Sequence, residues 1–554
     1  EVTSSRPGGI VEAFKRFEET CRAFLDPSFY RHPVRDIERR DTHISAVFLT
    51  GDWAYKLKKP VDFGFLDFST LEKRLHCCRQ EVALNGRLSR GVYHSVETIR
   101  RDDMGRLRLG GEGDVVEVAV RMRQLPEEAS LQFLLSKPSQ EERRPGDELG
   151  IRAAEIGRVL ASFYRSSPRS PSVDHFGDPD VVAYNVEENF LQVEPFAAQL
   201  LPLDRWELVR EVSRAFLRFW RPLFEKRIEE GRIHDGHGDL RPDHIYLLDR
   251  IQIIDCIEFN DRFRYGDAAS DLSFLHMELE KLGQSGLSRT ILDAYVEAAR
   301  DYDLYALIDF YAAYRAVVKV KVACLRLSEL DDADEKEMLR REAETYLSLA
   351  YRFALQFSRP TLWVCCGLPA SGKSYLARAL AEALSLVMVQ SDRLRKEREG
   401  IATSEPVIVG YDEGLYKRER RQYVYAAMLA IAQEELRRGR SVILDGSFSR
   451  RRWRDDARRL ALDCDTNVIF LECACDEKGI RERLLQREVT GGASDARLHH
   501  LPKMIEEFEP TSELSSLEHV VVDTCRPFDQ SLAKVFSAAY ACKCEQVSAV
   551  LERL

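Results

Sequence analysis

The stretch "HGDLRPDHIYLLDRIQIIDCIEF", residues 237–259, places a short polar segment before two apolar runs. The runs "IYLL" and "IQII" flank Asp249-Arg250, so we expect a β-hairpin that turns at these two residues. Asp255 lies near the end of the second run, among isoleucines. A carboxylate in such surroundings is costly unless it is paired or coordinated. The pattern therefore predicts a functional role for Asp255.

The polar segment before the hairpin contains His237, Gly238 and Asp239, and His244 follows Asp239 by five residues. This order resembles the protein-kinase catalytic loop, in which H-x-D precedes a metal-binding Asn and, on a later strand, a metal-binding Asp. The resemblance implies that Asp239 is a catalytic base for an incoming hydroxyl. It also implies that His244 and Asp255 are metal ligands. The alternative is a structural hairpin with a capped aspartate.

Two charged residues upstream fit the same arrangement. The run "WAYKLKK" is typical of a strand and contains Lys56, while "STLEKRLHCCRQEVALNGRL" has helical periodicity and contains Glu81. A capping box between Ser69 and Glu72 is predicted at the start of this helix. By resemblance to the V-A-I-K strand of kinases, Lys56 would pair with Glu81 and bind nucleotide phosphates. Taken singly, the two residues also fit a surface lysine and an ordinary helix glutamate.

Residues 40–330 resemble the aminoglycoside phosphotransferase and choline kinase-like superfamily, whose loop usually reads HGDLHxxN. The resemblance implies a two-lobed protein-kinase-like fold that binds ATP and Mg²⁺. This sequence departs from the pattern at His244, because imidazole is a poorer partner than a carbonyl oxygen for Mg²⁺. Either the second metal is weak or absent, or Asp243 compensates. The segment "ERRDTHIS", where a phosphate-covering loop is expected, contains no glycine.

The segment that follows Asp255 is short. Only about ten residues separate Asp255 from "YGDAASDLSF", which leaves no room for the activation loop of a protein kinase. We therefore expect a small-molecule acceptor at this site. Asp267 and Asp271, within that segment, are predicted to be structural carboxylates that tie the catalytic loop to a helix.

A second phosphate-binding pattern, "GLPASGKS", matches G-x-x-x-x-G-K-[ST] at every fixed position. It follows an apolar run and precedes a helical one, which is the context that a P-loop requires. Backbone N–H groups of such a loop bind phosphate oxygens, its lysine reaches the β- and γ-phosphates, and its serine holds Mg²⁺. The nucleotide-binding residues predicted here are Gly367, Leu368, Pro369, Ala370, Ser371, Gly372, Lys373 and Ser374, of which Ser374 is also a metal ligand.

Two carboxylates and two arginines complete this second site. Asp445 ends the run "SVILD" and is predicted to hold the metal, and Asp392, after "LVMVQ", is predicted to take the proton of an acceptor hydroxyl. Arg483 and Arg487 lie four residues apart on one helical face and are predicted to neutralise the transferred phosphate. Helix caps and a solvated helix face are the alternatives. Residues 360–525 resemble the P-loop kinases of small molecules, a group that includes gluconate kinase, chloramphenicol phosphotransferase, zeta-toxin-type kinases and polynucleotide 5′-kinases.

The length of 554 residues predicts two to four domains. We predict an α/β multi-domain chain with the N-lobe of a kinase-like domain at 1–125 and its helical C-lobe at 126–357. A P-loop kinase domain with a parallel sheet is predicted at 358–554, where strands alternate with helices. As a whole, the chain resembles the bacterial bifunctional aminoglycoside phosphotransferase/ATP-binding proteins. That is a similarity of fold and does not establish aminoglycosides as substrates.

The composition excludes several classes of partner. The formal net charge of −10 and the pI of about 5.8 disfavour a general nucleic-acid binder. No apolar run reaches the roughly 18–20 residues that span a bilayer, and no signal-peptide pattern opens the sequence. We therefore expect no membrane partner and a cytoplasmic location. The thirteen cysteines form no CxxC pair, so we expect buried, reduced thiols and no zinc site.

The function predicted from these motifs is ATP-dependent transfer of the γ-phosphoryl group to hydroxyls of small molecules at two Mg²⁺-assisted sites. Two alternatives stay open. In the first, the N-terminal region senses nucleotide and only the P-loop domain is catalytic. In the second, the run "SRRRWRDDARR" binds nucleic-acid ends by base stacking on Trp453, although such runs are more often solvated helix faces. The motifs do not choose between ATP and GTP or identify either acceptor.

Overall fold

The computed structural model describes residues 7–136, 148–327, 330, 332–384, 386–401, 418–490, 497–526 and 528–551. The chain packs as two compact units, one made of residues 1–182 and 224–291 and the other of residues 183–223 and 292–554. The domain boundaries predicted from the sequence, after residues 125 and 357, stay a prediction. Among the described residues, no helix is both long and apolar enough to cross a bilayer.

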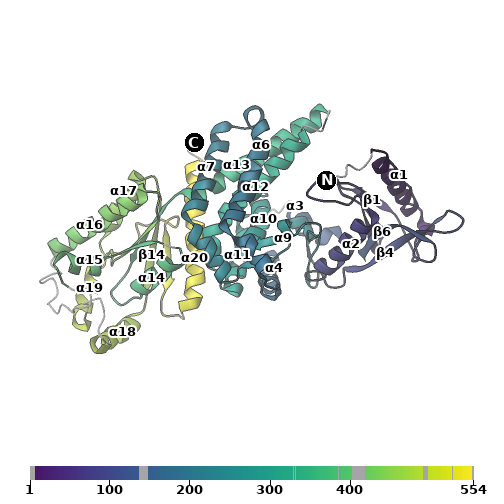
Figure 1. The fold of residues 1–554 in the computed structure, drawn as a ribbon. Coiled ribbons are helices and arrows are strands. Elements are labelled where there is room, and N and C mark those ends of the chain that lie inside the picture. The colour runs from purple at the N-terminus through teal and green to yellow at the C-terminus, as the bar shows by residue number, and fades with distance from the viewer. Residues whose placement is uncertain are drawn as a thin grey trace. The chain divides into compact units, whose positions relative to one another are not determined.

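The first unit begins with an antiparallel sheet in the strand order β1-β2-β3-β6-β4-β5 (Figure 1). Its strands are β1 (Glu38–Asp41), β2 (Ser45–Leu49), β3 (Trp53–Lys58), β4 (Tyr93–Arg101), β5 (Leu107–Leu109) and β6 (Asp114–Arg123). Alternating apolar residues predict β2, β3, β4 and β6, and the structure confirms these four. The other two were missed because β1 reads "ERRD", with no apolar residue, and because the alternation "LRL" of β5 covers only 3 residues.

Two helices, α1 (Pro7–Phe24) and α2 (Leu71–Asn85), pack against this sheet. The ring of Phe24 in α1 lies 5.0 Å from the ring of Phe48 in β2, measured between centroids. Cys78 of α2 is fully buried against valines of β6. The sheet and α2 thereby form one core, which holds the residues of β3 and α2 in a fixed relation.

The start of α2 differs in detail from the prediction. The side chain of Thr70 accepts a hydrogen bond from the Lys73 N–H, so Thr70 is the N-cap of the helix. The predicted capping box of Ser69 and Glu72 is therefore wrong by one position. Ser69 instead donates its hydroxyl to the carboxylate of Asp67, at 2.6 Å, because a serine before a helix can also bond a neighbouring side chain.

The rest of the first unit consists of helices and short strands, two of which belong to the stretch 237–259. These are α3 (Leu131–Ser136), α4 (Glu148–Ser166), α5 (Pro171–Asp174), β7 (Ile233–Asp235), β8 (Ile245–Leu247), β9 (Ile251–Ile253), α9 (Asp261–Arg264), β10 (Tyr265–Asp267) and α10 (Ala268–Lys281). The strands β8 and β9 pair antiparallel, which confirms the hairpin that turns at Asp249-Arg250. Asp255 lies two residues beyond β9, so the expectation of a carboxylate inside a strand is corrected.

Helices make up the first half of the second unit. The helices α6 (Pro179–Leu200), α8 (Arg221–Glu229) and α11 (Ser285–Ala299) have residues in both units, whereas α7 (Leu203–Phe219), α12 (Leu304–Leu327) and α13 (Ala333–Ser358) belong to the second. The ring of Phe216 in α7 stacks on that of Phe310 in α12, with centroids 4.8 Å apart. It also meets the ring of Phe357 in α13 edge-on at 5.1 Å. This aromatic cluster joins the three helices.

The second half of this unit contains a parallel sheet in the order β12-β13-β11-β14-β15 (Figure 1). Its strands are β11 (Thr361–Cys366), β12 (Val387–Gln390), β13 (Val442–Asp445), β14 (Asn467–Ala474) and β15 (His519–Asp523). Every neighbouring pair runs parallel, which confirms the predicted sheet. The carboxyl ends of all five strands therefore meet at one edge, where ligands bind in folds of this class.

Helices cover both faces of the parallel sheet. The helices of this half of the unit are α14 (Lys373–Ala383), α15 (Ser391–Arg398), α16 (Arg418–Arg437), α17 (Arg451–Asp463), α18 (Glu477–Thr490), α19 (Leu501–Glu507) and α20 (Phe528–Leu551). Leu362 and Val364 of β11 pack with Met428 of α16 and Ala457 of α17 on one face. Because alternate residues of a strand point to opposite faces, Trp363 and its neighbour two positions on face the other side. Every residue of β11 is buried, as a central strand requires.

Candidate functional site

The N-terminal candidate site centres on Lys56 of β3. Its Nζ lies 2.5 Å from Oδ1 of Asp255 and 2.9 Å from Oε1 of Glu81. Glu81 comes from α2 and Asp255 from the segment after β9, so three separate elements of the first unit supply the three charges. The structure therefore brings these sequence-predicted residues into direct contact. Their roles in binding nucleotide and metal stay predictions.

A second lysine shares the same glutamate, and sequence reasoning missed it. Nζ of Lys58 lies 2.6 Å from Oε2 of Glu81 and also pairs with Glu258. Burial alone would lower the pKa of Lys58, but the carboxylates of Glu258 and Glu81 outweigh it and raise that pKa above its ordinary value. Residues two apart on a strand face the same side, so the position of Lys58 after Lys56 was a usable signal.

Asp255 has an unusual backbone and an open side chain. Its φ is 64°, in the left-handed region, which costs a non-glycine residue about 1–3 kcal/mol and is typical of functional positions. The Asp255 N–H donates to the hydroxyl of Tyr93 at 3.2 Å, and 41% of the side chain is exposed. Desolvation would raise the pKa of Asp255, but the ammonium of Lys56 holds it below its usual range. The carboxylate is therefore ionised and accessible.

Asp271 of α10 holds the catalytic loop by its backbone. One carboxylate oxygen accepts from the N–H of His237 at 2.7 Å and from the Tyr164 hydroxyl at 2.9 Å, and the other accepts from the N–H of Gly238 at 2.8 Å. Gly238 has φ 86°, and a Cβ there would lie 2.8 Å from the carbonyl oxygen of Phe263, so only glycine fits. The predicted structural role of Asp271 is confirmed.

The other structural carboxylate, Asp267, holds the start of α10. Its side chain accepts from the N–H of Ala269 at 2.7 Å and forms a two-point ion pair with Arg227, at 2.5 and 2.8 Å. Both Asp267 and Arg227 are buried. Such a planar, two-bond pair is geometrically specific, so this predicted structural role is confirmed as well.

His244 lies between the carboxylates of Asp239 and Asp255. Its Nδ1 is 3.8 Å from Oδ2 of Asp239, and its Nε2 is 3.7 Å from Oδ2 of Asp255. Nδ1 also lies 2.8 Å from the backbone carbonyl oxygen of Asp239. The side chain of Asp239 is 28% exposed and lies 3.3 Å from Nε of Arg241, a residue that sequence reasoning missed. The structure thus assembles the predicted positions, and their catalytic roles stay predictions.

The C-terminal candidate site is the loop between β11 and α14. Three of its residues have left-handed backbones: Gly367 with φ 131°, Ala370 with φ 61° and Gly372 with φ 94°. A Cβ at Gly367 would lie 2.7 Å from the carbonyl oxygen of Cys473, which explains the requirement for glycine there. The loop opens into the N-terminus of α14, whose partial positive charge favours bound anions.

Lys373 begins α14 and bends back over this loop. Its Nζ donates to the carbonyl oxygen of Leu368 at 2.5 Å. Burial lowers the pKa of Lys373, while the nearby Cys473, Asp445 and Asp392 act in the opposite direction. The lysine is therefore a poorly solvated cation close to both predicted acidic residues. Ser374, the next residue, is exposed at the helix start.

The two acidic residues of this site do not cap helices. Asp445 ends β13, and its Oδ2 accepts from the side-chain amide of Gln390 at 3.0 Å. Asp392 pairs with Arg395 at 2.6 Å inside the first turn of α15. The N-caps of α15 and α17 are Gln390 and Arg450, so the capping alternative is wrong for both aspartates. The hydroxyl of Ser374 and the carboxylate of Asp445 are oxygen donors of the kind that Mg²⁺ prefers.

Arg483 of α18 reaches the same loop. Its guanidinium donates to the carbonyl oxygen of Thr524 at 2.6 Å and to that of Ala370 at 3.2 Å. Thr524 in turn donates its hydroxyl to the carbonyl oxygen of Ser371 at 2.6 Å, a contact that sequence reasoning missed. Arg487 lies in α18, but its side chain is outside the described residues. Arg483 therefore rests on the backbone of the loop, from which it must turn to reach a phosphate.

The basic run of α17 does not form a surface for bases. Trp453 is 8% exposed and stacks on Tyr425 with ring centroids 4.1 Å apart. Arg454 is fully buried and pairs with Glu513 at 2.5 Å. The proposed stacking of a base on Trp453 is therefore wrong for this fold. The solvated-face alternative is also only partly right, because Arg454 belongs to the core.

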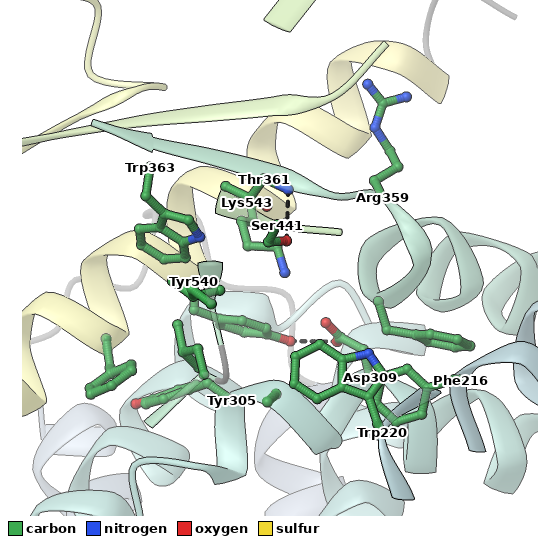
Figure 2. A pocket seen from close by; sticks show the side chains of 15 residues that line it. Phe216, Trp220, Tyr305, Asp309, Arg359, Thr361, Trp363, Ser441, Tyr540 and Lys543 are labelled. Carbon is green, nitrogen blue, oxygen red and sulfur yellow. Dashed lines mark hydrogen bonds between the residues drawn. The ribbon is translucent and has the colours of Figure 1, made fainter. Parts of the chain in front are cut away.

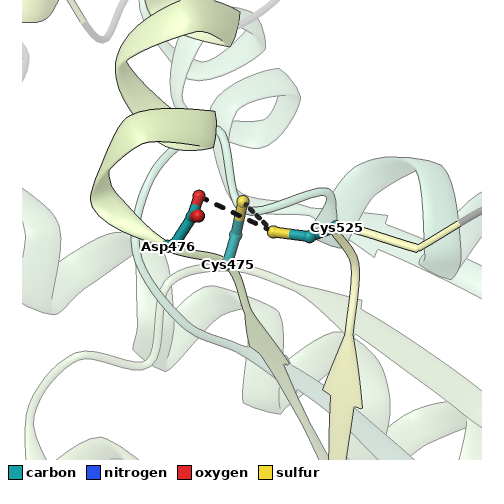
Figure 3. Close-up of side chains that lie close together, drawn as sticks. All are labelled: Cys475, Asp476 and Cys525. Carbon is teal, nitrogen blue, oxygen red and sulfur yellow. Dashed lines mark hydrogen bonds between the residues drawn. The ribbon is translucent and has the colours of Figure 1, made fainter.

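Three side chains of the kinds that bind metal ions lie together beside the P-loop: Cys475, Asp476 and Cys525 (Figure 3). The two sulfur atoms are 3.0 Å apart. Two thiolates on one tetrahedral zinc, each with a bond of about 2.3 Å, would be separated by nearly 4 Å, so the pair does not match a zinc site. Burial raises the pKa of Cys475 to about 11, so it is a thiol. The thirteen cysteines are all free, but Cys525 is exposed, which corrects the expectation that all are buried.

A cavity of about 70 Å³ lies at the other end of β11, near its first residue. Aromatic side chains such as Trp220 and Tyr305 line it, and Lys543 reaches into it from α20 (Figure 2). The Tyr540 hydroxyl donates to Asp309 at 2.6 Å on its wall. Because this cavity lies at the amino ends of the strands, it is separate from the P-loop, which follows the carboxyl end of β11.

Comparisons with known proteins match two separate regions of the chain. Residues 107–311 match a family described as "Phosphotransferase enzyme family", and residues 362–511 match one described as "AAA domain". Uncharacterized proteins of Mycobacterium bovis (Mb2027c) and Mycobacterium tuberculosis (Rv2004c) are each 34% identical over 473 residues, which is 84% of this chain and 89% of theirs. The chain thus combines a phosphotransferase-type, kinase-like region with a P-loop kinase domain, as predicted.

Solved structures similar to parts of the chain include three kinases. A gluconokinase from Sinorhizobium meliloti is 24% identical and covers 35% of this chain and 97% of its own, with a TM-score of 0.25. A choline/ethanolamine kinase family protein from Mesorhizobium loti is 15% identical and covers 60% of this chain and 99% of its own, with a TM-score of 0.35. A GDP complex of an aminoglycoside phosphotransferase is 13% identical and covers 59% and 97%, with a TM-score of 0.34.

Proposed function

This chain belongs to the family of the mycobacterial protein Rv2004c, and from that premise we propose that it is a phosphotransferase with two independent sites. Each site transfers the γ-phosphoryl group of ATP to a hydroxyl of a small molecule, with the help of Mg²⁺. Two observations together carry the proposal: the contact of Lys56 with both Glu81 and Asp255 in one unit, and a complete P-loop in the other.

In the N-terminal site, Lys56 holds the α- and β-phosphates, and Glu81 keeps its ammonium in place. Asp255 is ionised and accessible, which suits a ligand of Mg²⁺, and the bound ion would neutralise phosphate charge. Asp239 takes the proton of the acceptor hydroxyl on its carboxylate. The side chain of Asp239 is 28% exposed, so its carboxylate is accessible to the acceptor.

In the C-terminal site, the loop N–H groups and the start of α14 bind the phosphates. Nucleotide binding requires Lys373 to leave the carbonyl oxygen of Leu368 and turn to the β- and γ-phosphates. Ser374 and Asp445 would hold Mg²⁺, and Asp392 takes the proton of the acceptor. Arg483 moves from the loop backbone to the transferred phosphate. Arg487, predicted from the sequence for the same role, belongs to the same helix.

The acceptor of the N-terminal site is proposed to be small because the segment that connects Asp255 to α10 is short. Only α9 and β10 lie between Asp255 and α10, and α9 has 4 residues and β10 has 3. A protein kinase needs a long segment here to bind a polypeptide substrate. For the C-terminal site, we propose a small hydroxyl compound as the acceptor, because the domain resembles the P-loop kinases of small molecules.

One observation favours a second candidate, in which the N-terminal site binds nucleotide without turnover. His244 stands where the metal-binding Asn of the resembling families is expected, and its ring is engaged by neighbouring residues. The P-loop site would then be the catalytic one. This candidate predicts nucleotide binding at Lys56 and no product that depends on Asp239.

The test is transfer of labelled γ-phosphate from ATP to an extract of small metabolites by the full-length chain. We expect two sets of products, of which Asp239→Asn removes one and Lys373→Ala removes the other. Asp249→Asn, at an exposed hairpin turn, and Arg378→Ala, on the exposed side of α14, are the matched controls and should change neither set. If Asp239→Asn still binds ATP and keeps every product, the N-terminal site is a sensor.

A further inference from the structure

Arg241 occupies the centre of the catalytic loop and contacts three of its polar side chains. Its Nε lies 3.3 Å from Oδ2 of Asp239, and its NH2 group lies 3.1 Å from Oδ2 of Asp243. The same NH2 group lies 2.8 Å from Nε2 of His244. The related HGDLHxxN loops place the metal-binding Asn at the position of His244. The cation of Arg241 therefore lies beside the position from which a second metal ion would be held.

The hydrogen bonds of His244 define which of its nitrogens carries the proton. Nδ1 lies 2.8 Å from the carbonyl oxygen of Asp239, which can only accept, so Nδ1 carries the hydrogen. A guanidinium can only donate, so Nε2 must accept from Arg241 with its lone pair. The lone pair of Nε2 is therefore engaged by Arg241. A metal ion needs that lone pair, so His244 does not fit the predicted role of a metal ligand while Arg241 is in place.

The surrounding charges keep Arg241 protonated. Burial would lower its pKa, but the carboxylates of Asp239, Asp243 and Asp255 raise it above the ordinary value. Asp255 belongs to this group because its Oδ2 is 3.7 Å from His244 Nε2, the nitrogen that accepts from Arg241. A permanent positive charge thus faces three carboxylates, which would otherwise repel one another and an incoming triphosphate.

We propose that the N-terminal site uses a single metal ion, held by Asp255, and that Arg241 supplies the positive charge that a second ion supplies in the resembling enzymes. The inference rests on the proposed function of this site. Arg241 also acts as a positioning residue, because its Nε lies 3.3 Å from Oδ2 of Asp239 and pairs with that carboxylate. His244 connects Arg241 to Asp239, since it accepts a hydrogen bond from Arg241 and donates one to the backbone carbonyl oxygen of Asp239.

The direct test is the number of Mn²⁺ ions bound per chain with a saturating non-hydrolysable ATP analogue, measured by electron paramagnetic resonance. Lys373→Ala is the background, so that the P-loop contributes as little as possible, and any ion that remains in Lys373→Ala/Asp255→Asn is subtracted. We expect one ion in the background. We expect two ions after Arg241→Ala and His244→Asn are added, because the usual ligand is restored and the competing cation is removed.

Two ions in the Lys373→Ala background would overturn the inference, whether or not the further variants fold. No nucleotide-dependent ion at all would remove the proposed function of the site, and the inference with it.

The matching kinetic readout is the rate of the Asp239-dependent transfer at saturating MgATP. This rate should not change with added free Mg²⁺ in the natural chain. Arg241→Ala should lower it about a hundredfold, with partial recovery in Arg241→Lys, and a purely structural role would not produce the change in ion count.

Discussion

Lys56 Nζ and Asp255 Oδ1 lie 2.5 Å apart, although 199 residues separate them in the chain. Glu81 holds the other side of the same ammonium from a third element. Three charged residues converge in this way only if the sheet, α2 and the hairpin are all in place. The ion pairs thus connect the fold of the first unit to the site that we propose for the nucleotide.

The first prediction concerns Lys58, whose ammonium pairs with two buried carboxylates, those of Glu81 and Glu258. Lys58→Met leaves these buried carboxylates short of one cation, and losing one partner of such a group costs about 3–5 kcal/mol. Lys59→Met is the control, since Lys59 pairs at 3.1 Å with a partly exposed Asp41 and should cost less than about 1 kcal/mol. Urea unfolding of the first unit measures both. Equal losses for the two variants would mean that the buried network does not stabilise the unit.

A second prediction uses the backbone of the catalytic loop. Gly238→Ala introduces a Cβ 2.8 Å from the carbonyl oxygen of Phe263 at a φ of 86°, so we expect a loss of about 1–3 kcal/mol and of the Asp239-dependent transfer. Gly266→Ala has open space around it and an ordinary φ, and should leave both unchanged. Thermal unfolding and the transfer assay report on the two quantities. A fully active Gly238→Ala variant would contradict the described loop geometry.

The third prediction concerns pH at the P-loop. Burial lowers the pKa of Lys373 in the nucleotide-free chain, so its ammonium is lost as pH rises through this lowered value. Bound phosphates stabilise the ammonium and raise the same pKa. Binding of ATP should therefore take up protons at alkaline pH, and affinity should fall as pH rises. Calorimetry in buffers of different ionisation enthalpy measures the uptake, and no uptake up to pH 10 would be evidence against it.

A fourth prediction tests the hydroxyl of Thr524, which donates to the carbonyl oxygen of Ser371 in the P-loop. Thr524→Val removes this bond, and a loss of about 1 kcal/mol corresponds to roughly fivefold weaker nucleotide binding at the C-terminal site. Thr524→Ser keeps the hydroxyl and should bind normally. The Asp239-dependent products should be unaffected in both variants. Unchanged affinity in Thr524→Val would show that this contact does not hold the loop.

Sequence reasoning succeeded where a motif has fixed spacing or a clear period. The P-loop residues, the strands of the parallel sheet, four strands of the antiparallel sheet and the pairing of Lys56 with Glu81 were all predicted in this way. The roles of Asp267 and Asp271 followed from their position near the loop. These features depend on local sequence or on a well-defined pattern, so they can be read without coordinates.

Other features depend on contacts that no local pattern contains. The hydrogen bond between Arg241 and His244 depends on the side-chain rotamers of two residues that lie three positions apart in an irregular loop. The burial of Trp453 in a basic run depends on Tyr425, from another helix of the same unit. Glu258 becomes part of the lysine network only because the segment after β9 returns to α2 and β3. Packing between distant segments decides each of these.

The central claim, two separate nucleotide sites in one chain, is tested most directly by counting bound nucleotide. Equilibrium dialysis of the full-length chain with a labelled non-hydrolysable ATP analogue and Mg²⁺ should give two nucleotides per chain. The count should fall to one in Lys56→Ala, to one in Lys373→Ala and to zero when both are replaced. One nucleotide per chain in the natural protein, or the loss of both through either single substitution, would contradict the account.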